Sequence, residues 1–180
     1  MNLLDHIDVV PNFPIEGINF YDIQSLLKKP DIWANIIDDL ARDVQAQGAE
    51  IILGIESRGF LTGVPVAQKL GLPFGMVRKK GKLPGKVIAQ EYALEYGTDT
   101  IEIQDGLIQA GTKVAIMDDL LATGGTMKAT GDLVRKIGGE IVSSICIIEL
   151  HELGGRDKLD FPFDALLQAP LDPFAKSKSA

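Results

Sequence analysis

Residues 113–130 read Lys-Val-Ala-Ile-Met-Asp-Asp-Leu-Leu-Ala-Thr-Gly-Gly-Thr-Met-Lys-Ala-Thr. The apolar run from Val114 to Met117 is typical of a buried parallel strand, and core-forming side chains then recur at helical spacing from Met127 to Ile137. The polar and glycine residues between them predict a turn from the end of a strand to the start of a helix. The backbone N–H groups of Ala122 to Thr126 would point out of that helix start, where unpaired donors and the helix dipole favour an anion. We expect a phosphate to bind at this turn.

Two carboxylates, Asp118 and Asp119, precede the turn. They would repel a bare anion, so a suitable ligand must carry hydroxyls or a metal ion beside its phosphate, as a ribose 5-phosphate does. The stretch is not a Walker A loop, because no Gly-Lys-Ser/Thr follows, and the dinucleotide fingerprint Gly-x-Gly-x-x-Gly is absent. An ordinary strand-to-helix turn with two solvated aspartates remains the alternative.

The composition is that of a globular protein, with 46% hydrophobic and 24% charged residues, and 180 residues fit one domain spanning 1–180. The net charge of -7 argues against a nucleic-acid partner, since phosphate contacts need concentrated Lys and Arg. No apolar run has membrane-spanning length, and the first residues are too acidic for a signal peptide. We expect a cytoplasmic protein that does not contact a membrane.

Cysteine and histidine offer little chemistry in this sequence. Cys146 lies in an apolar run and is expected in the core, and His6 and His151 are expected at the surface or at an edge. Two histidines and one cysteine leave almost no material for a histidine-based triad or a zinc site.

Regular elements alternate along the chain. Residues 31–47 predict a helix with Asp31 as its N-cap, 51–55 a buried strand, 59 to about 70 a helix that tolerates Pro65, and 71–77 a further strand. Residues 141–150 predict another strand, after which Gly154-Gly155 is expected to end the compact part and 171–180 to form a frayed tail. This alternation predicts an α/β fold with a mostly parallel sheet.

The first thirty residues are expected to form a small N-terminal cap, with a short helix over 1–10 and an irregular loop over 11–22. The loop carries Phe13, Phe20 and Tyr21. These aromatic side chains either pin the loop to the core or stack on a flat heterocycle.

A second turn, Glu56-Ser57-Arg58-Gly59, repeats the layout of the first: the end of a strand, polar and glycine residues, and the start of a helix. Ligands of open parallel sheets bind at the carboxyl ends of strands, so both turns are expected to face one crevice. Arg58 would bring a planar donor fork to it, although a surface arginine is the simpler interpretation when this turn is taken alone.

Residues 78–104 are expected to form a flexible hairpin between parallel strands. The hairpin begins with a loop, 78–86, in which five of nine residues are basic, a charge suited to a pyrophosphate or triphosphate. Glu95 lies between Leu94 and Tyr96. In an apolar pocket its pKa would be raised and it could exchange a proton with a ring nitrogen, whereas in water it is a surface glutamate.

Four segments, 52–60, 77–85, 92–97 and 117–126, together resemble the adenine-specific branch of the type I phosphoribosyltransferase family. The resemblance covers roughly residues 11 to 160. It implies the type I phosphoribosyltransferase fold, in which helices flank a central, mostly parallel sheet with an inserted flexible β-hairpin (78–104) and a small N-terminal hood (1–30).

The resemblance also implies an activity: adenine and phosphoribosyl pyrophosphate give AMP and pyrophosphate. Mg²⁺ would be held mainly by the substrate, with no direct protein ligand, and a homodimer is implied. The residue roles that it implies group by ligand. The ribose 5-phosphate would bind to Asp118, Asp119, Ala122, Thr123, Gly124, Gly125 and Thr126. The pyrophosphate would bind to Ser57, Arg58, Arg78, Lys79 and Lys82. The base would contact Phe20 and Arg58, and Glu95 would exchange a proton with it.

The family often has a non-proline cis peptide where this chain has Glu56-Ser57, and it usually has a basic residue where this chain has Tyr21. The second difference puts in doubt any contact made by that side chain. Two other functions remain open. One is transfer to another base (hypoxanthine, guanine, xanthine or orotate), and the other is a non-catalytic purine sensor, which would be expected to carry a basic DNA-binding segment.

Overall fold

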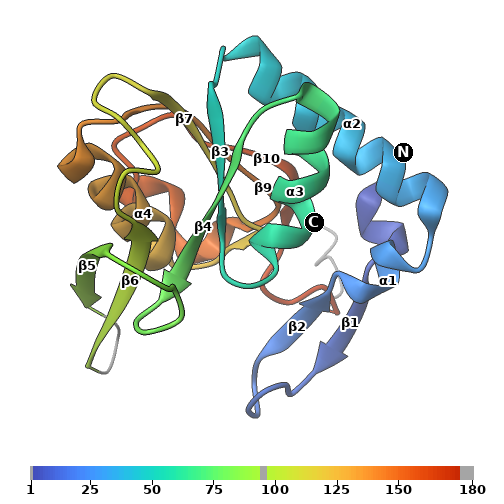
Figure 1. Cartoon of the computed structure of the whole chain (residues 1–180). Helices are drawn as coiled ribbons and strands as arrows, with labels where there is room; N and C mark the ends of the chain where they lie inside the picture. Colours follow the sequence, from blue (N-terminus) through green and yellow to red (C-terminus); the bar gives the residue numbers. More distant parts are fainter. Residues whose placement is uncertain (1, 94–96, 175–180) are drawn as a thin grey trace.

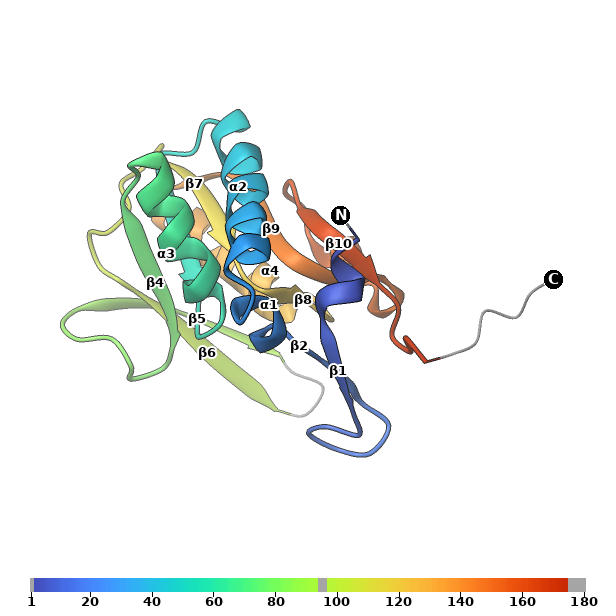
Figure 2. The same cartoon turned by 90° about the vertical axis from the view of Figure 1, so that its right-hand side faces the viewer.

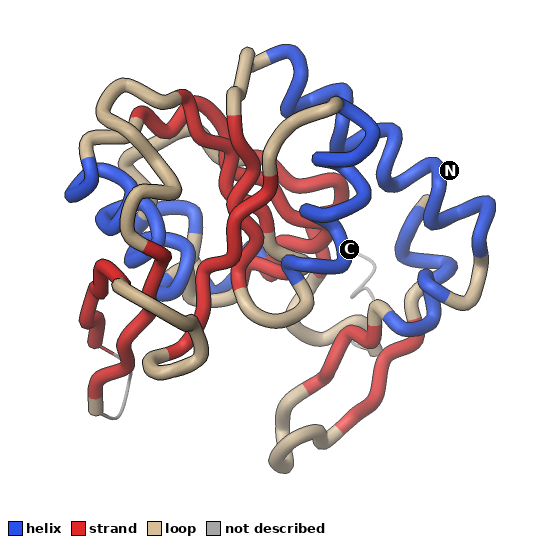
Figure 3. The backbone as a smooth tube through the Cα atoms, in the orientation of Figure 1, coloured by secondary structure: helices blue, strands red, loops and turns tan. Residues whose placement is uncertain are grey.

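A mixed sheet of eight strands forms the centre of the protein, with helices on both of its faces (Figure 1, Figure 3). The computed structural model describes residues 2–93 and 97–174. The main strand order is β10-β9-β7-β3-β4-β6-β5, and β8 pairs with β9. The strands are β3 (Ile51–Ile55), β4 (Phe74–Lys79), β5 (Val87–Ala93), β6 (Thr98–Gln104), β7 (Lys113–Met117), β8 (Leu120–Leu121), β9 (Glu140–Leu150) and β10 (Asp164–Ala169).

Most of these strands are parallel, as predicted. The antiparallel part is the hairpin β5–β6, which joins the sheet where β6 pairs with β4 through Arg78 and Lys79. The basic loop therefore starts at the edge of the parallel sheet and leads directly into the hairpin.

Both faces of the parallel strands are covered. The helices α2 (Pro30–Ala46) and α3 (Gly59–Leu70) pack on one face, and α4 (Gly125–Ile137) packs on the other. Side chains alternate accordingly along β7: Met117 joins the core under α2, and Ile116 joins the core under α4. Cys146 is buried in the second core, as expected. No helix in the described part of the chain has both the length and the apolar character needed to cross a membrane.

The N-terminal region differs from the prediction. The chain forms a short helix, η1 (Leu3–His6), then an antiparallel hairpin of β1 (Asp8–Pro11) and β2 (Asn19–Asp22), and then α1 (Gln24–Leu27). The predictions of a helix over 1–10 and of an irregular loop over 11–22 are therefore wrong in part. The prolines mislead the sequence interpretation because an edge ribbon tolerates proline where a central strand does not. Figure 2 shows this hairpin standing apart from the main sheet.

Two other boundaries are corrected. The helix α2 begins with Pro30 at its first position after Lys29, so Asp31 lies inside the first turn and is not its N-cap. After η2 (His151–Leu153), the compact part continues beyond Gly154-Gly155 through η3 (Arg156–Lys158) to β10, which pairs in parallel with β9. The sequence of β10, Asp-Ala-Leu-Leu-Gln-Ala, contains no β-branched residue and gives no strand signal of its own.

Candidate active site

The two predicted turns lie side by side at the carboxyl ends of β3 and β7. Gly59, the first residue of α3, makes this approach possible, because a Cβ atom there would lie 2.6 Å from the carbonyl oxygen of Met117. The peptide bond between Glu56 and Ser57 is cis, as the resemblance implied. The structure thus places the two turns side by side at the carboxyl ends of neighbouring strands, as the topology of a parallel sheet predicts.

The backbone of the acidic pair is held by β9. The N–H of Asp118 donates to the carbonyl of Ile145, and the carbonyl of Asp119 accepts from the N–H groups of Ile147 and Ile148 at 3.1 and 3.0 Å. The N–H of Asp119 donates to Oδ1 of Asp118 at 2.9 Å. These bonds fix both carboxylates beyond the end of β7.

Arg58 links the acidic pair to the N-terminal hairpin. Its Nε lies 3.0 Å from Oδ2 of Asp119, a side chain that is only 4% exposed. That oxygen receives no hydrogen bond from the described residues, so the two groups form an ion pair without hydrogen-bond geometry. The guanidinium carbon of Arg58 also lies 5.1 Å from the ring centre of Phe20. Arg58 therefore contacts Phe20 on one side and Asp119 on the other.

Burial opposes the charge of both aspartates. It raises the pKa of Asp118 well above its ordinary value, and the neighbouring charge of Asp119 adds to this effect. Burial also raises the pKa of Asp119, although the Arg58 guanidinium partly offsets it. A ligand that donates hydrogen bonds to these carboxylates would stabilise their charged form.

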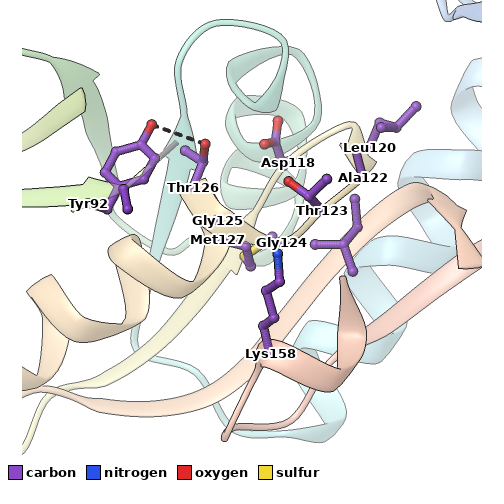
Figure 4. A pocket seen from close by; sticks show the side chains of 12 residues that line it. Tyr92, Asp118, Leu120, Ala122, Thr123, Gly124, Gly125, Thr126, Met127 and Lys158 are labelled. Atoms are coloured by element: carbon purple, nitrogen blue, oxygen red, sulfur yellow. Dashed lines mark hydrogen bonds between the residues drawn. The ribbon is translucent and has the colours of Figure 1, made fainter. Parts of the chain in front are cut away.

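A cavity of about 480 Å³ lies in front of the glycine turn (Figure 4). It is lined by Asp118, by the continuous segment Leu120 to Met127, by Tyr92 and Ala93 of β5, and by Lys158. Gly124, with a φ of 78°, precedes α4, and no side chain caps the helix. The amides at this helix start are thus left for a ligand, which is the anion-binding arrangement that the sequence predicted.

The turn also packs against a segment that the sequence interpretation placed outside the compact part. A Cβ atom on Gly155 would lie 3.0 Å from the amide nitrogen of Gly124 and would also clash with the carbonyl oxygen of Ala122. Only glycine permits this contact of backbone against backbone. The Gly-Gly pair at 154–155 is the available sequence signal, but from the sequence alone it is interpreted as the end of the compact part.

The sequence interpretation also missed Tyr92 as a lining residue. Its hydroxyl lies 3.2 Å from Oγ1 of Thr126, which joins the β5–β6 hairpin to the start of α4 (Figure 4). Lys158, the other missed lining residue, carries no local pattern that would have marked it.

The basic residues Arg78, Lys79 and Lys82 do not line this cavity. Arg78 donates from Nε to Oε2 of Glu56 at 3.2 Å, so the basic loop is attached beside the second turn. Burial acts to raise the pKa of Glu56, but hydrogen bonds from the Lys79 N–H and from Arg78 outweigh it and lower that pKa. The Lys79 ammonium contacts Asp99 and the Tyr92 hydroxyl, and Lys82 is exposed.

Tyr21 and Glu95 complete the set of predicted residues. Tyr21 is 1% exposed, and its hydroxyl donates to the carbonyl oxygen of Pro170 at 2.5 Å, so it points into the core, away from the Phe20 face. Glu95 lies outside the described residues.

The carboxylate pair beside an uncapped, glycine-led helix start defines the class of phosphoribosyl transferases. The family model described as "Phosphoribosyl transferase domain" matches residues 22–166. Adenine phosphoribosyltransferase from Rhodospirillum rubrum is 53% identical over 93% of this chain and 98% of its own length.

Solved structures agree with this class. The adenine phosphoribosyltransferase of Thermoanaerobacter pseudethanolicus has a TM-score of 0.90 and 42% identity, covering 93% of this chain and 98% of that one. The Saccharomyces cerevisiae enzyme, solved with adenine and an imino-altritol bisphosphate, has a TM-score of 0.88 and 40% identity, covering 92% of this chain and 96% of that one. The chain belongs to the adenine phosphoribosyltransferase family.

Proposed function

We propose that the protein transfers the 5-phosphoribosyl group of phosphoribosyl pyrophosphate to adenine, giving AMP and pyrophosphate in cytoplasmic purine salvage. The observation that carries this proposal is the chain of contacts from Phe20 through Arg58 to Asp119, beside a cavity that Asp118 and the uncapped start of α4 line. The Trypanosoma brucei adenine phosphoribosyltransferase, 28% identical, was solved with AMP, pyrophosphate and ribose-5-phosphate.

The ribose phosphate would bind first by its phosphate, on the backbone of Ala122 to Thr126. Its hydroxyls would then donate to Asp118 and Asp119. The geometry supports this because Asp118 and the turn line the same cavity, and because a buried carboxylate gains most from donors that replace lost water.

The pyrophosphate would lie on the side of the second turn. Ser57 and Arg58 belong to that turn, and Arg78, Lys79 and Lys82 begin the basic loop that Glu56 attaches to it. These cations would neutralise the charge that develops on the leaving group. In a homodimer, some residues of the basic loop would reach into the active site of the second subunit.

Mg²⁺ fits this site as an ion that arrives on the substrate. The described residues contain no group of three or more His, Cys, Asp or Glu side chains arranged to hold a metal. Mg²⁺ is commonly bound through substrate phosphates and few protein ligands, and here it would add positive charge to the pyrophosphate. The protein would hold it indirectly, through the basic residues that bind the phosphates.

In the reaction, adenine N9 forms a bond to C1 of the ribose while the bond from C1 to the pyrophosphate oxygen breaks. The electron pair leaves with the pyrophosphate, and positive charge develops on the sugar beside Asp118 and Asp119. Phe20, which contacts Arg58, would stack on the base. Glu95 would exchange the ring proton on the N7 side of the purine.

The test is release of pyrophosphate from phosphoribosyl pyrophosphate and Mg²⁺ with adenine, hypoxanthine, guanine, xanthine or orotate. We expect turnover with adenine alone. Turnover with another base but not with adenine would overturn the base assignment, and binding without turnover would indicate a sensor. Replacing Glu95→Gln should lower kcat, and full activity of that variant across pH would refute its role in proton transfer.

A further inference from the structure

We propose that Lys158 is a further substrate-binding residue of this site, supplying the positive charge that the phosphate turn itself lacks, and that Arg156 is its positioning residue. The proposal rests on the function proposed above, because it assigns a role toward the 5-phosphate. Among the described residues that line the cavity, Lys158 is the one basic side chain. Figure 4 shows its nitrogen directed toward the turn at Gly124.

The charge balance of the cavity favours this role. A nucleotide phosphate carries between one and two negative charges at neutral pH, and Asp118 lies in the same cavity. The helix start offers only about half a positive charge. A lysine that lines the same cavity brings a full charge to the phosphate, and no acidic side chain in the described part of the chain forms an ion pair with it.

The backbone that carries Lys158 is anchored on both sides. Arg156, two residues earlier, donates from Nη2 and Nε to the carboxylate of Glu149 at 2.6 and 2.9 Å, and from Nη1 to the carbonyl of Phe163 at 2.8 Å. Glu149 lies on β9, and its side chain is 5% exposed. Gly155 packs against the turn itself.

This anchoring separates Lys158 from a lysine on a free surface turn. Its position relative to Ala122–Thr126 is set by a bidentate ion pair on one side and by a backbone contact on the other. Less backbone freedom therefore has to be lost when the ammonium binds a phosphate. The simpler interpretation, a solvated lysine with no role, makes the opposite prediction for the experiment below.

The experiment compares Lys158→Met, which keeps the length of the side chain and removes its charge, with Lys69→Met. Lys69 is exposed on α3 and pairs with Asp38, so the control removes the same charge elsewhere. Binding measured by calorimetry with AMP and with adenosine separates the contribution of the phosphate to the affinity. We expect Lys158→Met to weaken AMP binding about tenfold, as for the loss of one charge-assisted hydrogen bond, and to leave adenosine binding unchanged.

The pH dependence gives a second readout. The phosphate gains its second charge near about pH 6, so the ratio of AMP affinities between wild type and Lys158→Met should be larger at pH 8 than at pH 5. Equal AMP affinity in both proteins, or equal weakening of AMP and adenosine, would overturn the proposal. If the wild type neither binds AMP nor turns over adenine, the proposed function itself fails.

Arg156 is tested by its conservative variant. We expect Arg156→Lys to raise KM for phosphoribosyl pyrophosphate with kcat and the adenine KM unchanged, because a lysine cannot reproduce the bidentate pair that orients the turn. A parallel loss of all three parameters would show a merely structural role. Adding Lys158→Met to Arg156→Lys should raise that KM by less than Lys158→Met alone does, because both changes act through one ammonium group.

Discussion

The behaviour of single side chains is clearest at the acidic pair. Asp118 and Asp119 lie where burial penalises the charges that binding requires. Such an arrangement costs stability in the free protein and is typical of functional sites. It has a measurable consequence for the pH dependence of folding.

We expect Asp118→Asn to be more stable than the wild type at neutral pH while losing most activity. The folded-state pKa of Asp118 is raised, so the unfolded chain releases this proton first, from about pH 3.9 upward. The wild type therefore loses stability as the pH rises from there through the folded pKa. The gain of the variant should shrink toward zero near about pH 4. Calorimetric unfolding between pH 4 and 8 measures it, and a variant less stable than the wild type at pH 7 would contradict it.

Tyr21 behaves differently from the basic residue usual at that position in the family. Its hydroxyl bonds Pro170 inside the protein, so we expect Tyr21→Phe to cost about 1 kcal/mol in the free energy of unfolding. The adenine KM should stay unchanged because the side chain points away from the Phe20 face. Denaturant unfolding with steady-state kinetics checks both. A changed preference among bases would show that Tyr21 reads the base.

Among the elements, the β5–β6 hairpin contacts the ammonium group of Lys79, which we propose to bind the pyrophosphate of the substrate. Lys79 is assigned to the pyrophosphate, yet its ammonium contacts Asp99 and Tyr92 of the hairpin. Burial acts to lower the pKa of Lys79, but the hydrogen bonds to Asp99 and Tyr92, together with the charges of these two groups, outweigh it and raise that pKa. This contact competes with the pyrophosphate for the same charge.

We expect Asp99→Asn to lower KM for phosphoribosyl pyrophosphate about two- to fivefold, which is the range of a partly exposed ion pair. Asp39→Asn, which removes an exposed partner of Arg42, is the matched control and should change nothing. Steady-state kinetics at fixed adenine measures the effect. A higher KM would mean instead that Asp99 orients Lys79 for binding.

The elements also show where sequence interpretation succeeds. The helix α4 and the strand β7 were predictable because the apolar residues of α4 recur at helical spacing and those of β7 form a short continuous run typical of a buried strand. The strand β10 was not, since a partner, β9, makes it a strand. Likewise β1 and β2 pair only with each other, and neither has a strong pattern alone.

Considered as a whole, the molecule places its two hairpins along one edge, where both project in the same direction (Figure 1, Figure 2). The N-terminal hairpin carries Phe20, whose ring lies over Arg58 and touches Phe13 edge-on at 5.1 Å. The base site that we propose would therefore lie between the hood and the sheet, where Arg58 connects Phe20 to the acidic pair.

We expect Phe20→Leu to raise KM for adenine about tenfold, since stacking of a base on an aromatic ring is worth about 1–3 kcal/mol, with little change in the KM for phosphoribosyl pyrophosphate. Phe13→Leu is the matched control, because Phe13 is 50% exposed and packs edge-on against Phe20. Its effect should be smaller. Equal increases for both substrates in Phe20→Leu would argue for a general loosening of the hood.

The sequence by itself determined the α/β class, the phosphate turn and the acidic pair, because these depend on short-range periodicity and on the chemistry of adjacent residues. Only the tertiary structure decided that Arg58 contacts both Phe20 and Asp119, that Lys79 is held by Asp99, that Gly155 packs against the turn, and that Lys158 lines the cavity in front of it. These contacts join residues that are far apart in the chain. They form through strand order and close packing, which leave no local pattern in the sequence to detect.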